Sequence, residues 1–219
     1  MAFVGLPTPT CRLTMEAAIT PFGLSRDAAQ APITTQRLYL RPPLCGDIAA
    51  LSRLVSDPVI AGFTSQIRYP YTARDARQFV TFCETDTSPH LVAHFLLALR
   101  ANPKLVVGGA GFTWMAGGIP EIGYWIAAPY RRRGFAGDAT HAILHRLFTQ
   151  SSAPTVQAWV HVGNKPSQRL LKRAGFRRTG FGMRHSRAQG RHVPAVLFGL
   201  TRADWAKQAP RWQAADADL

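Results

Sequence analysis

Acidic residues and lysines are both scarce in this sequence. It contains 12 Asp or Glu against 26 Lys or Arg, which gives a net charge of +14. A positive charge of this size favours binding to RNA, DNA or an acidic partner. The basic residues are spread along the chain, however, and nearly all are Arg, which indicates codon usage as one cause. Contact with a ribosome or RNA is therefore the second interpretation, after an enzyme.

Cysteine is also scarce, and no cysteine pair has the spacing of a metal or redox motif. Cys11, Cys45 and Cys83 are far apart, which argues against a disulfide framework or a zinc site and fits a reducing cytoplasm. His141 and His145 are four residues apart and could share a metal. The Glu of a zinc-protease motif is absent, so they are interpreted as ordinary histidines on a helix surface, and no metal is expected.

Long hydrophobic runs are missing as well. No apolar stretch reaches the length of a membrane span, and the first residues lack the pattern of a secretory signal. The chain is expected to be soluble and cytoplasmic, with no membrane partner. With 219 residues, 47% of them hydrophobic, it can bury one substantial core.

The two commonest phosphate-binding loops are absent from the segment YRRRGFAGDA. A Walker loop needs Lys and Ser/Thr after its last glycine, but Gly137 is followed by Asp138 and Ala139. The dinucleotide fingerprint needs three glycines, and only Gly134 is clearly placed. What remains is a basic loop that enters a helix. Its small residues let backbone amides approach a phosphate, and the helix dipole favours an anion there.

The pattern along the chain predicts one domain with two appendages. Residues 1–33 are rich in Pro, Thr and Ala without periodicity and are expected to be a loosely ordered extension. Residues 34–206 form the domain, and residues 207–219 a C-terminal tail. Helical spacing predicts four helices, in GDIAALSRLV, YTARDARQFVTFCETD, the segment after Gly134 and NKPSQRLLKRAGF. Apolar and alternating runs predict seven strands, in QRLYLRPP, HLVAHFLLALR, LVVGGAGFTWM, EIGYWIA, TVQAWVHV and a closing hairpin that turns near Gly190.

The order of three motifs resembles that of a known superfamily. Arg131-x-x-Gly134-x-Ala136 follows the fourth strand, and a segment from Asn164-x-x-Ser167 to Ala174-Gly175-Phe176 follows the fifth. This arrangement, over residues 34–206, resembles the GNAT superfamily of acetyl-CoA-dependent N-acetyltransferases. TQRLYLRPP, EIGYWI and APYRRRGFAGDA are similar to the branch that contains ribosomal-protein alanine N-acetyltransferases.

The resemblance implies both a fold and a reaction. The expected α/β fold is a mixed, mostly antiparallel sheet of about seven strands, with a central splayed parallel pair and about four flanking helices. The expected reaction is direct transfer of acetyl from acetyl-CoA to a primary amine, in a protein N-terminus or a small molecule, within a ternary complex. The alternatives are a non-catalytic sensor that binds CoA and a basic ribosome- or RNA-associated protein. A monomer or a homodimer is expected.

The resemblance also assigns residues to the coenzyme. The loop and first helical turn would bind the pyrophosphate through amides and arginine charges; these residues are Arg131, Arg132, Arg133, Gly134, Phe135, Ala136 and Gly137. Backbone groups at Ile126, Ala127 and Ala128 would bind the pantetheine and polarise the thioester carbonyl. Asn164 would hydrogen-bond the pantetheine arm, or alternatively cap its helix. Lys172 is assigned to the coenzyme as well.

Two residues are candidates for the proton transfers. Glu121 begins the strand that ends beside the acetyl site, and alternation puts it on one face with Gly123 and Trp125, so it is the candidate base. Its alternative interpretation is a solvated carboxylate at the end of a turn. Many relatives carry a Tyr as acid on the helix after Asn164, but Leu170 and Leu171 occupy that stretch here. Ser167 is the candidate donor to the leaving thiolate, with water as the alternative.

Overall fold

A computed structural model describes residues 23–85, 92–115 and 117–217, and its centre is one eight-stranded sheet with the order β1-β2-β3-β4-β5-β6-β8-β7. All neighbouring strands are antiparallel except β5 and β6, which are parallel. The strands are β1 Ile33–Thr34, β2 Leu38–Arg41, β3 Val92–Leu99, β4 Asn102–Trp114, β5 Pro120–Ile126, β6 Thr155–His161, β7 Arg177–Ser186 and β8 Arg191–Thr201. The seven predicted strands are present, and the expected mixed sheet is confirmed. The additional strand, β1, has two residues and is too short to produce an alternating pattern.

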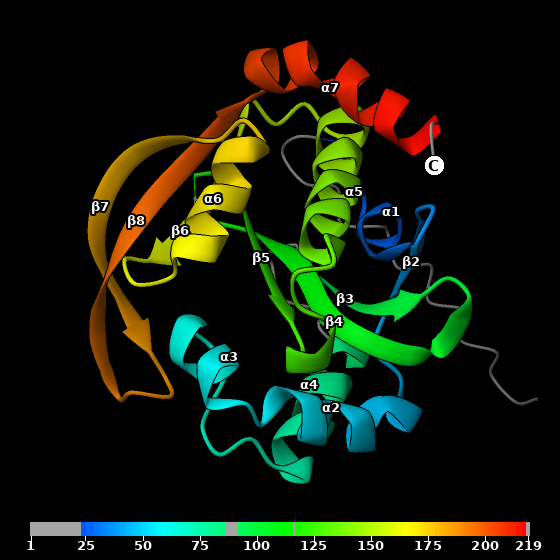
Figure 1. The fold of residues 1–219 in the computed structure, drawn as a ribbon, viewed down its shortest axis with the longest axis vertical. Helices are drawn as coiled ribbons and strands as arrows, with labels where there is room; N and C mark the ends of the chain where they lie inside the picture. Colours follow the sequence, from blue (N-terminus) through cyan, green and yellow to red (C-terminus); the bar gives the residue numbers. More distant parts are fainter. Residues whose placement is uncertain (1–22, 86–91, 116, 218–219) are drawn as a thin grey trace, which may run out of the picture.

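Helices cover both faces of the sheet (Figure 1). The α-helices are α1 Arg26–Gln30, α2 Ile48–Val55, α3 Pro58–Phe63, α4 Ala73–Thr85, α5 Phe135–Gln150, α6 Lys165–Arg173 and α7 Arg202–Ala217. In Figure 1 α2, α3 and α4 lie together on one side of the sheet, and α1, α5, α6 and α7 on the other. The four predicted helices correspond to α2, α4, α5 and α6. The prediction missed α1 and α3, which are too short for an apolar period, and α7.

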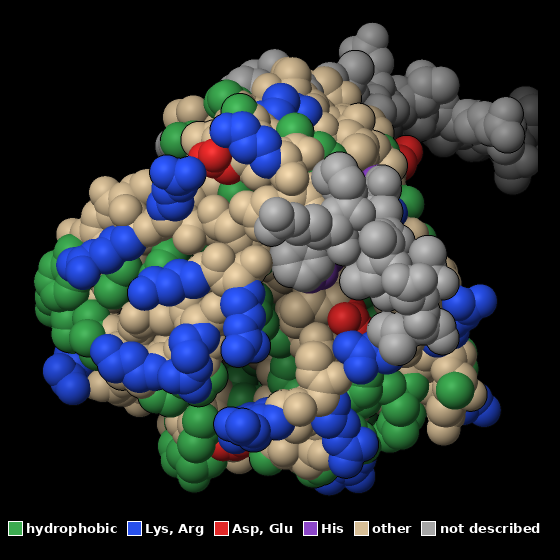
Figure 2. All heavy atoms as spheres, turned by 45° about the horizontal axis from the view of Figure 1, so that its top comes forward, with side chains coloured by type: hydrophobic (Ala, Val, Ile, Leu, Met, Phe, Trp, Pro, Cys, Tyr) green, Lys and Arg blue, Asp and Glu red, His purple; other side chains and the backbone are tan. Residues whose placement is uncertain are grey.

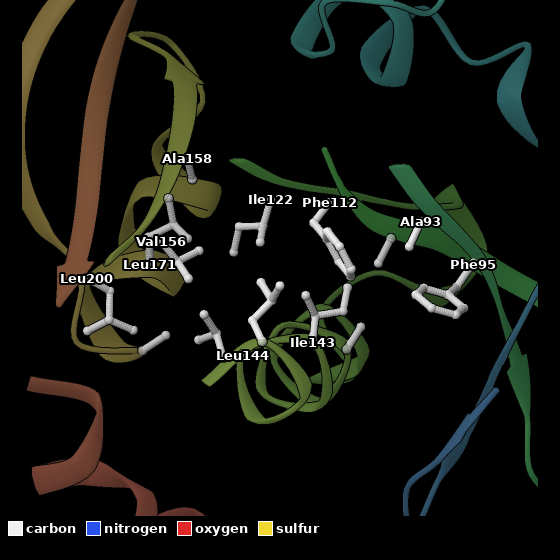
Figure 3. Close-up of a cluster of buried hydrophobic side chains, with 14 of the residues drawn as sticks. Ala93, Phe95, Phe112, Ile122, Ile143, Leu144, Val156, Ala158, Leu171 and Leu200 are labelled. Atoms are coloured by element: carbon white, nitrogen blue, oxygen red, sulfur yellow. The ribbon is translucent and has the colours of Figure 1, made fainter. Parts of the chain in front are cut away.

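The larger core lies between the sheet and α5. The apolar face of this helix is buried in full, since Ala139, Ile143, Leu144, Leu147 and Phe148 are all at most 2% exposed. Figure 3 shows side chains of α5 directed at residues of the strands, with Ile143 and Leu144 near Phe112, Ile122 and Val156. Burial of apolar area on this scale is the main favourable contribution to folding.

A second core lies on the opposite face. Leu51 and Val55 of α2 meet Ala76 and Val80 of α4 over Leu96 and Val106 of the sheet. The first turn of α4 is held by a capping interaction between Thr72 and Asp75. Asp75 Oδ2 accepts a hydrogen bond of 2.8 Å from the Thr72 N–H, and Thr72 Oγ1 accepts one of 3.3 Å from the Asp75 N–H.

The N-terminal extension and the tail differ from the expectation where the structure describes them. Leu24 and Ala29 are 1% and 0% exposed and belong to the larger core. The buried Arg146 guanidinium donates to the carbonyls of Ala29, Ala31 and Pro32, which ties this segment to α5. Residues 24–33 are therefore part of the domain, and residues 1–22 lie outside the described chain. The boundary expected at residue 206 falls inside α7.

Candidate active site

The parallel strands β5 and β6 separate along their length. They share one registered pair, Glu121 with Gln157, and then diverge towards their C-terminal ends (Figure 1). The expected splay of the central parallel pair is thus present. Ile126 and His161 end the two strands, so the opening lies at the edge of the sheet where α5 and α6 begin.

The register of β5 with β4 decides which backbone groups face this opening. The Ala127 N–H donates to the Val107 carbonyl at 3.0 Å, beside the pair Gly108–Ile126. Because bonding alternates along an antiparallel ladder, the backbone groups of Tyr124 and the N–H of Ile126 point towards β6. The Ile126 carbonyl accepts a 3.1 Å bond from Arg131 Nε. The prediction placed free groups at Ile126, Ala127 and Ala128; the Ala127 amide is not free, because it completes the ladder.

The carbonyls after β5 are used in a tight turn. The Ala127 carbonyl accepts from the Tyr130 N–H at 2.9 Å, and the Ala128 carbonyl accepts from the Arg131 N–H at 3.4 Å. Both carbonyls are thus occupied within the turn, whereas Tyr124, which the prediction did not include, directs its backbone N–H and carbonyl towards the opening.

The loop then enters α5 through two left-handed residues, Arg132 with φ 61° and Gly134 with φ 85°. The Gly134 carbonyl accepts from the N–H groups of Gly137, at 2.8 Å, and Asp138, at 3.2 Å. In the described chain, the amides of Phe135 and Ala136 have no such acceptor, as is usual at a helix start. Of the amides predicted to bind a phosphate, that of Gly137 is therefore occupied within the helix.

Arg37, just before β2, holds this helix start. Its Nε and Nη2 donate to the two carboxylate oxygens of Asp138 at 2.8 and 2.9 Å, and its Nη1 donates to the Arg133 carbonyl at 2.9 Å. The same guanidinium lies 5.2 Å from the centre of the Phe135 ring, whose side chain is packed in the core. A Cβ on Gly134 would lie 2.7 Å from Arg37 Nη2. The closeness of Arg37 explains, together with the positive φ, why glycine stands at this position.

The three loop arginines have different environments. Arg131 Nη2 lies 2.5 Å from Asp57 Oδ2, and Asp57 also caps α3 by accepting from the Val59 N–H at 2.7 Å. Arg131 therefore ties the loop to the opposite side of the sheet, and its charge is already paired. Arg132 and Arg133 are exposed, and Arg133 lies 5.8 Å from the centre of the Tyr130 ring.

The start of α6 faces the opening from the other strand. Asn164 Oδ1 accepts from the Ser167 N–H at 3.2 Å, so Asn164 does cap the helix, the alternative raised for it. Ser167 Oγ lies 2.9 Å from the hydroxyl of Tyr124 on β5. Burial raises the pKa of Tyr124 to about 12, against the effect of the Ser167 hydrogen bond. Lys172 lies on the exposed outer side of α6, away from this contact.

Glu121 lies on the other face of the sheet. Its Oε1 accepts a 2.9 Å bond from Arg184 Nη2 on β7, and its Oε2 lies 3.5 Å from Gln157 Nε2. Burial raises the pKa of Glu121, and the charge of Arg184 and the Gln157 hydrogen bond oppose the rise. The carboxylate is thus paired rather than solvated. Its side chain keeps 18% of its surface exposed, which leaves it accessible.

Two tryptophans complete this face. Trp125 packs on β4 so closely that a Cβ at Gly109 would lie 2.5 Å from its Nε1, and Trp159 lies 5.3 Å from the Arg184 guanidinium. Arg184, which lies over the Trp159 ring, was not anticipated, because no local pattern distinguishes it from the other arginines.

The comparisons with known proteins identify the family. Residues 37–177 match the family described as the acetyltransferase (GNAT) domain. The chain belongs to the GNAT family. It is therefore an acetyl-CoA-dependent N-acetyltransferase, and acetyl-CoA is its cosubstrate.

The relatives agree with this GNAT assignment over most of the domain. The N-acetyltransferase p20 of Bacillus licheniformis is 28% identical over 178 residues, which cover 78% of this chain and 97% of that protein. The solved structure of Mycobacterium smegmatis RimJ in complex with a CoA disulfide is 20% identical, with a TM-score of 0.69, and covers 84% of this chain and 96% of its own. The ribosomal L7/L12 α-N-protein acetyltransferase RimL, solved in complex with coenzyme A, is 15% identical, with a TM-score of 0.65, and covers 78% and 97%.

Two further findings concern the described residues alone. No helix among them is both long enough and apolar enough to cross a membrane. Within the same ranges, no three His, Cys, Asp or Glu side chains gather as a metal site would require.

Proposed function

We propose that this acetyltransferase acts on the α-amine of a protein N-terminus, by direct attack on acetyl-CoA in a ternary complex. The observation that carries the proposal is the divergence of β5 and β6, with Glu121 on one face of the sheet and the Tyr124–Ser167 pair on the other. A reaction across the opening needs a base on the side of the amine acceptor and a hydrogen-bond donor on the side of the leaving thiol. Glu121 is suited to the first role, and the Tyr124–Ser167 pair to the second. The fold shared with RimL, a ribosomal L7/L12 α-N-protein acetyltransferase, supports a protein acceptor rather than a small-molecule amine.

On the coenzyme side, we assign the pyrophosphate to the start of α5. The amides of Phe135 and Ala136 point out of the helix, and the exposed Arg132 and Arg133 add charge. Gly134 allows the loop to approach closely. Arg131 acts through Asp57 to position the loop, so we expect it to contribute no direct phosphate contact.

The pantetheine chain is assigned to the edge of β5. The Ile126 N–H and the backbone groups of Tyr124 face the opening and are suited to bind amides and to polarise the thioester carbonyl. Asn164 Oδ1 is used in capping, which leaves its Nδ2 group to donate to the pantetheine. We assign no coenzyme contact to Lys172, because it lies on the exposed outer side of α6.

On the acceptor side, Glu121 is the proposed base. An α-amine has a pKa near ~8, so it arrives largely protonated at neutral pH and must lose a proton before attack. Burial raises the pKa of Glu121, which strengthens it as a base, while Arg184 keeps the carboxylate ionised and oriented. His161, at the end of β6, is less suited because its Nε2 is fully buried.

The bond changes then balance within the site. The ammonium first gives one proton to Glu121; the amine nitrogen then forms a bond to the acetyl carbon, the carbon–sulfur bond breaks, and the second proton that the nitrogen loses passes to the sulfur. The thiolate that leaves accepts a hydrogen bond from Ser167, whose hydroxyl is in turn bonded to Tyr124. The high pKa of Tyr124, about 12, keeps its hydroxyl protonated as the second donor of this pair.

A matched pair of peptides tests the proposed acceptor. CoA release is measured with a peptide that has a free N-terminus and no lysine, and with its N-terminally blocked counterpart that contains one lysine. Turnover of the first peptide alone is expected. Turnover of the second alone, or of small amines only, would contradict the N-terminal acceptor, and CoA binding with no turnover of any amine would favour the non-catalytic sensor.

A further inference from the structure

The positive charge of this protein is concentrated in one part of the chain. Between Asp138 and Asp204 the sequence has eleven Lys or Arg and no acidic residue. The remaining fifteen basic residues are nearly balanced by all 12 acidic ones. Basic residues are thus spread along the whole sequence, but the net charge is uneven, because every acidic residue lies outside the segment between Asp138 and Asp204.

Some of these eleven residues serve the fold. Arg146 and Arg202 donate to backbone carbonyls, and Arg184 pairs with Glu121. The other eight are exposed, and Arg177 has a carboxylate partner, Asp204 at 3.5 Å. Figure 2 shows Lys and Arg side chains side by side on the half of the molecule that carries α6 and β7, with few acidic side chains beside them.

Four of the exposed cations form a stripe along α6. Lys165, Arg169, Lys172 and Arg173 are at the spacing i, i+4, i+7 and i+8, which puts them on one side of the helix. Leu171, on the inner side, is buried in the core, so the stripe faces solvent. Within the described chain, none of the four has a carboxylate within the 4.0 Å of an ion pair. Their charges repel one another and are not neutralised by the fold.

The stripe continues onto the edge strand β7. The register with β8 pairs Arg178 with Phe198 and Phe181 with Val196. Phe198 and Val196 belong to the core under α6, so Arg178 and Phe181 share the face of the sheet on which α6 lies. Phe181 is 58% exposed, which is unusual for so large an apolar side chain. Together these six residues, Lys165, Arg169, Lys172, Arg173, Arg178 and Phe181, are called the α6–β7 face below.

We propose that the α6–β7 face binds single-stranded RNA, independently of the acetyl transfer proposed above. Among the described residues these five cations have no carboxylate partner, so they match a polyanion, and Phe181 adds to the same face an exposed aromatic ring on which a base can stack. A bilayer would require several apolar anchors, whereas α6 has none on its solvent side and β7 offers only Phe181 and Met183 on this face. An acidic protein would pair with the cations but has no nucleobase to stack on Phe181. RNA can pair its phosphates with the cations and stack a nucleobase on the Phe181 ring.

The test compares two double variants of equal charge. Arg169→Gln with Arg173→Gln removes two cations of the α6–β7 face, and Arg187→Gln with Arg191→Gln removes two exposed cations at the β7–β8 turn. Binding of a fluorescein-labelled oligouridylate of about 15 nucleotides is followed by anisotropy without acetyl-CoA. The first variant is expected to bind about tenfold more weakly than wild type in ~0.1 M salt, with a salt slope smaller by ~1.4. The second should change affinity less than about twofold.

The third variant, Phe181→Ala, separates stacking from charge. It is expected to weaken binding about fivefold or more with the salt slope unchanged, because it removes a ring and no cation. Equal losses in both double variants, an unchanged affinity in Phe181→Ala, or polyglutamate binding that RNA does not displace would each overturn the proposal. So would a parallel loss of CoA affinity in the Arg169/Arg173 variant, which would make this face part of the coenzyme site. Peptide turnover is measured separately, so failure of the acetyl-transfer proposal remains distinguishable.

Discussion

The Tyr124 hydroxyl on β5 lies 2.9 Å from the Ser167 Oγ on α6, and the hydrogen bond between them spans the splayed edge of the sheet. Tyrosine is missing from the helix stretch where many relatives carry one, but here a tyrosine hydroxyl reaches that helix from the neighbouring strand. The contact therefore joins the strand to which we assign the thioester carbonyl to the helix to which we assign the leaving thiol.

Removal of either hydroxyl should slow the release of CoA. We expect Tyr124→Phe and Ser167→Ala each to lower kcat about tenfold with little change in KM for acetyl-CoA, because the donor acts on the leaving thiolate. The double variant should lose little more than either single variant, since the two hydroxyls act as one unit. Steady-state kinetics of CoA release measures all three. A fully additive double variant, or losses matched by a lower melting temperature, would contradict a coupled proton donor.

Glu121→Gln should lower turnover about 100-fold at neutral pH and leave acetyl-CoA affinity unchanged, because the amide cannot accept the ammonium proton. Part of the loss should be recovered at higher pH, as more amine arrives deprotonated. Arg184→Gln is the companion variant. Arg184 opposes the rise in the Glu121 pKa, so its removal should shift the acidic limb of kcat/KM to higher pH. An acidic limb unmoved in Arg184→Gln would show that Glu121 does not set it.

Gly134→Ala should weaken CoA binding about tenfold, because the methyl group meets the held Arg37 guanidinium and the backbone has φ 85°. Gly137→Ala is the matched control. A Cβ there meets nothing within 4 Å, and its amide is already bonded to the Gly134 carbonyl, so CoA affinity should be retained. Calorimetric titration with CoA measures both. Equal losses in the two variants would show that the coenzyme also approaches the backbone closely at Gly137.

Leu24→Ala should lower the free energy of unfolding by about 2–4 kcal/mol, because the side chain is 1% exposed in the larger core. Leu44→Ala removes the same atoms from a residue that is 55% exposed and should change stability by less than about 0.5 kcal/mol. Denaturant unfolding compares the two. A negligible effect at Leu24 would restore the original expectation of a loosely attached segment.

His141 should make the protein less stable in acid. Burial lowers its pKa from 6.5 to about 4, against the charge of Asp138. Between these values the unfolded chain binds a proton that the folded chain does not, so stability falls as the pH drops from 6.5 towards 4, by up to about 3 kcal/mol. His141→Gln should flatten this dependence in urea unfolding, whereas His145→Gln, at an exposed position one turn later, should keep it. Parallel curves for His141→Gln and wild type would argue against a buried neutral imidazole.

Much of the fold followed from local patterns. The buried face of α5, the capping box at Thr72 and the turn at Gly134 were all predictable, because side-chain periodicity and glycine placement act over a few residues. The splay was expected only because the three motifs, in their order, resemble those of the GNAT superfamily. The prediction missed Leu24 and α3, because these short segments contain too few apolar residues to show a helical period.

Tertiary structure determined which residues form hydrogen bonds with the residues of the site. Glu121 and Arg184 are 63 residues apart, and Arg37 and Asp138 are 101 apart, yet each pair is joined by hydrogen bonds. The sequence identified Glu121 and Ser167 as chemically suitable, but not that one is paired with an arginine and the other with Tyr124. Those contacts depend on the order of strands in the sheet and on the register between them. A strand's own residues determine which side chains share a face, whereas its neighbours determine what that face meets.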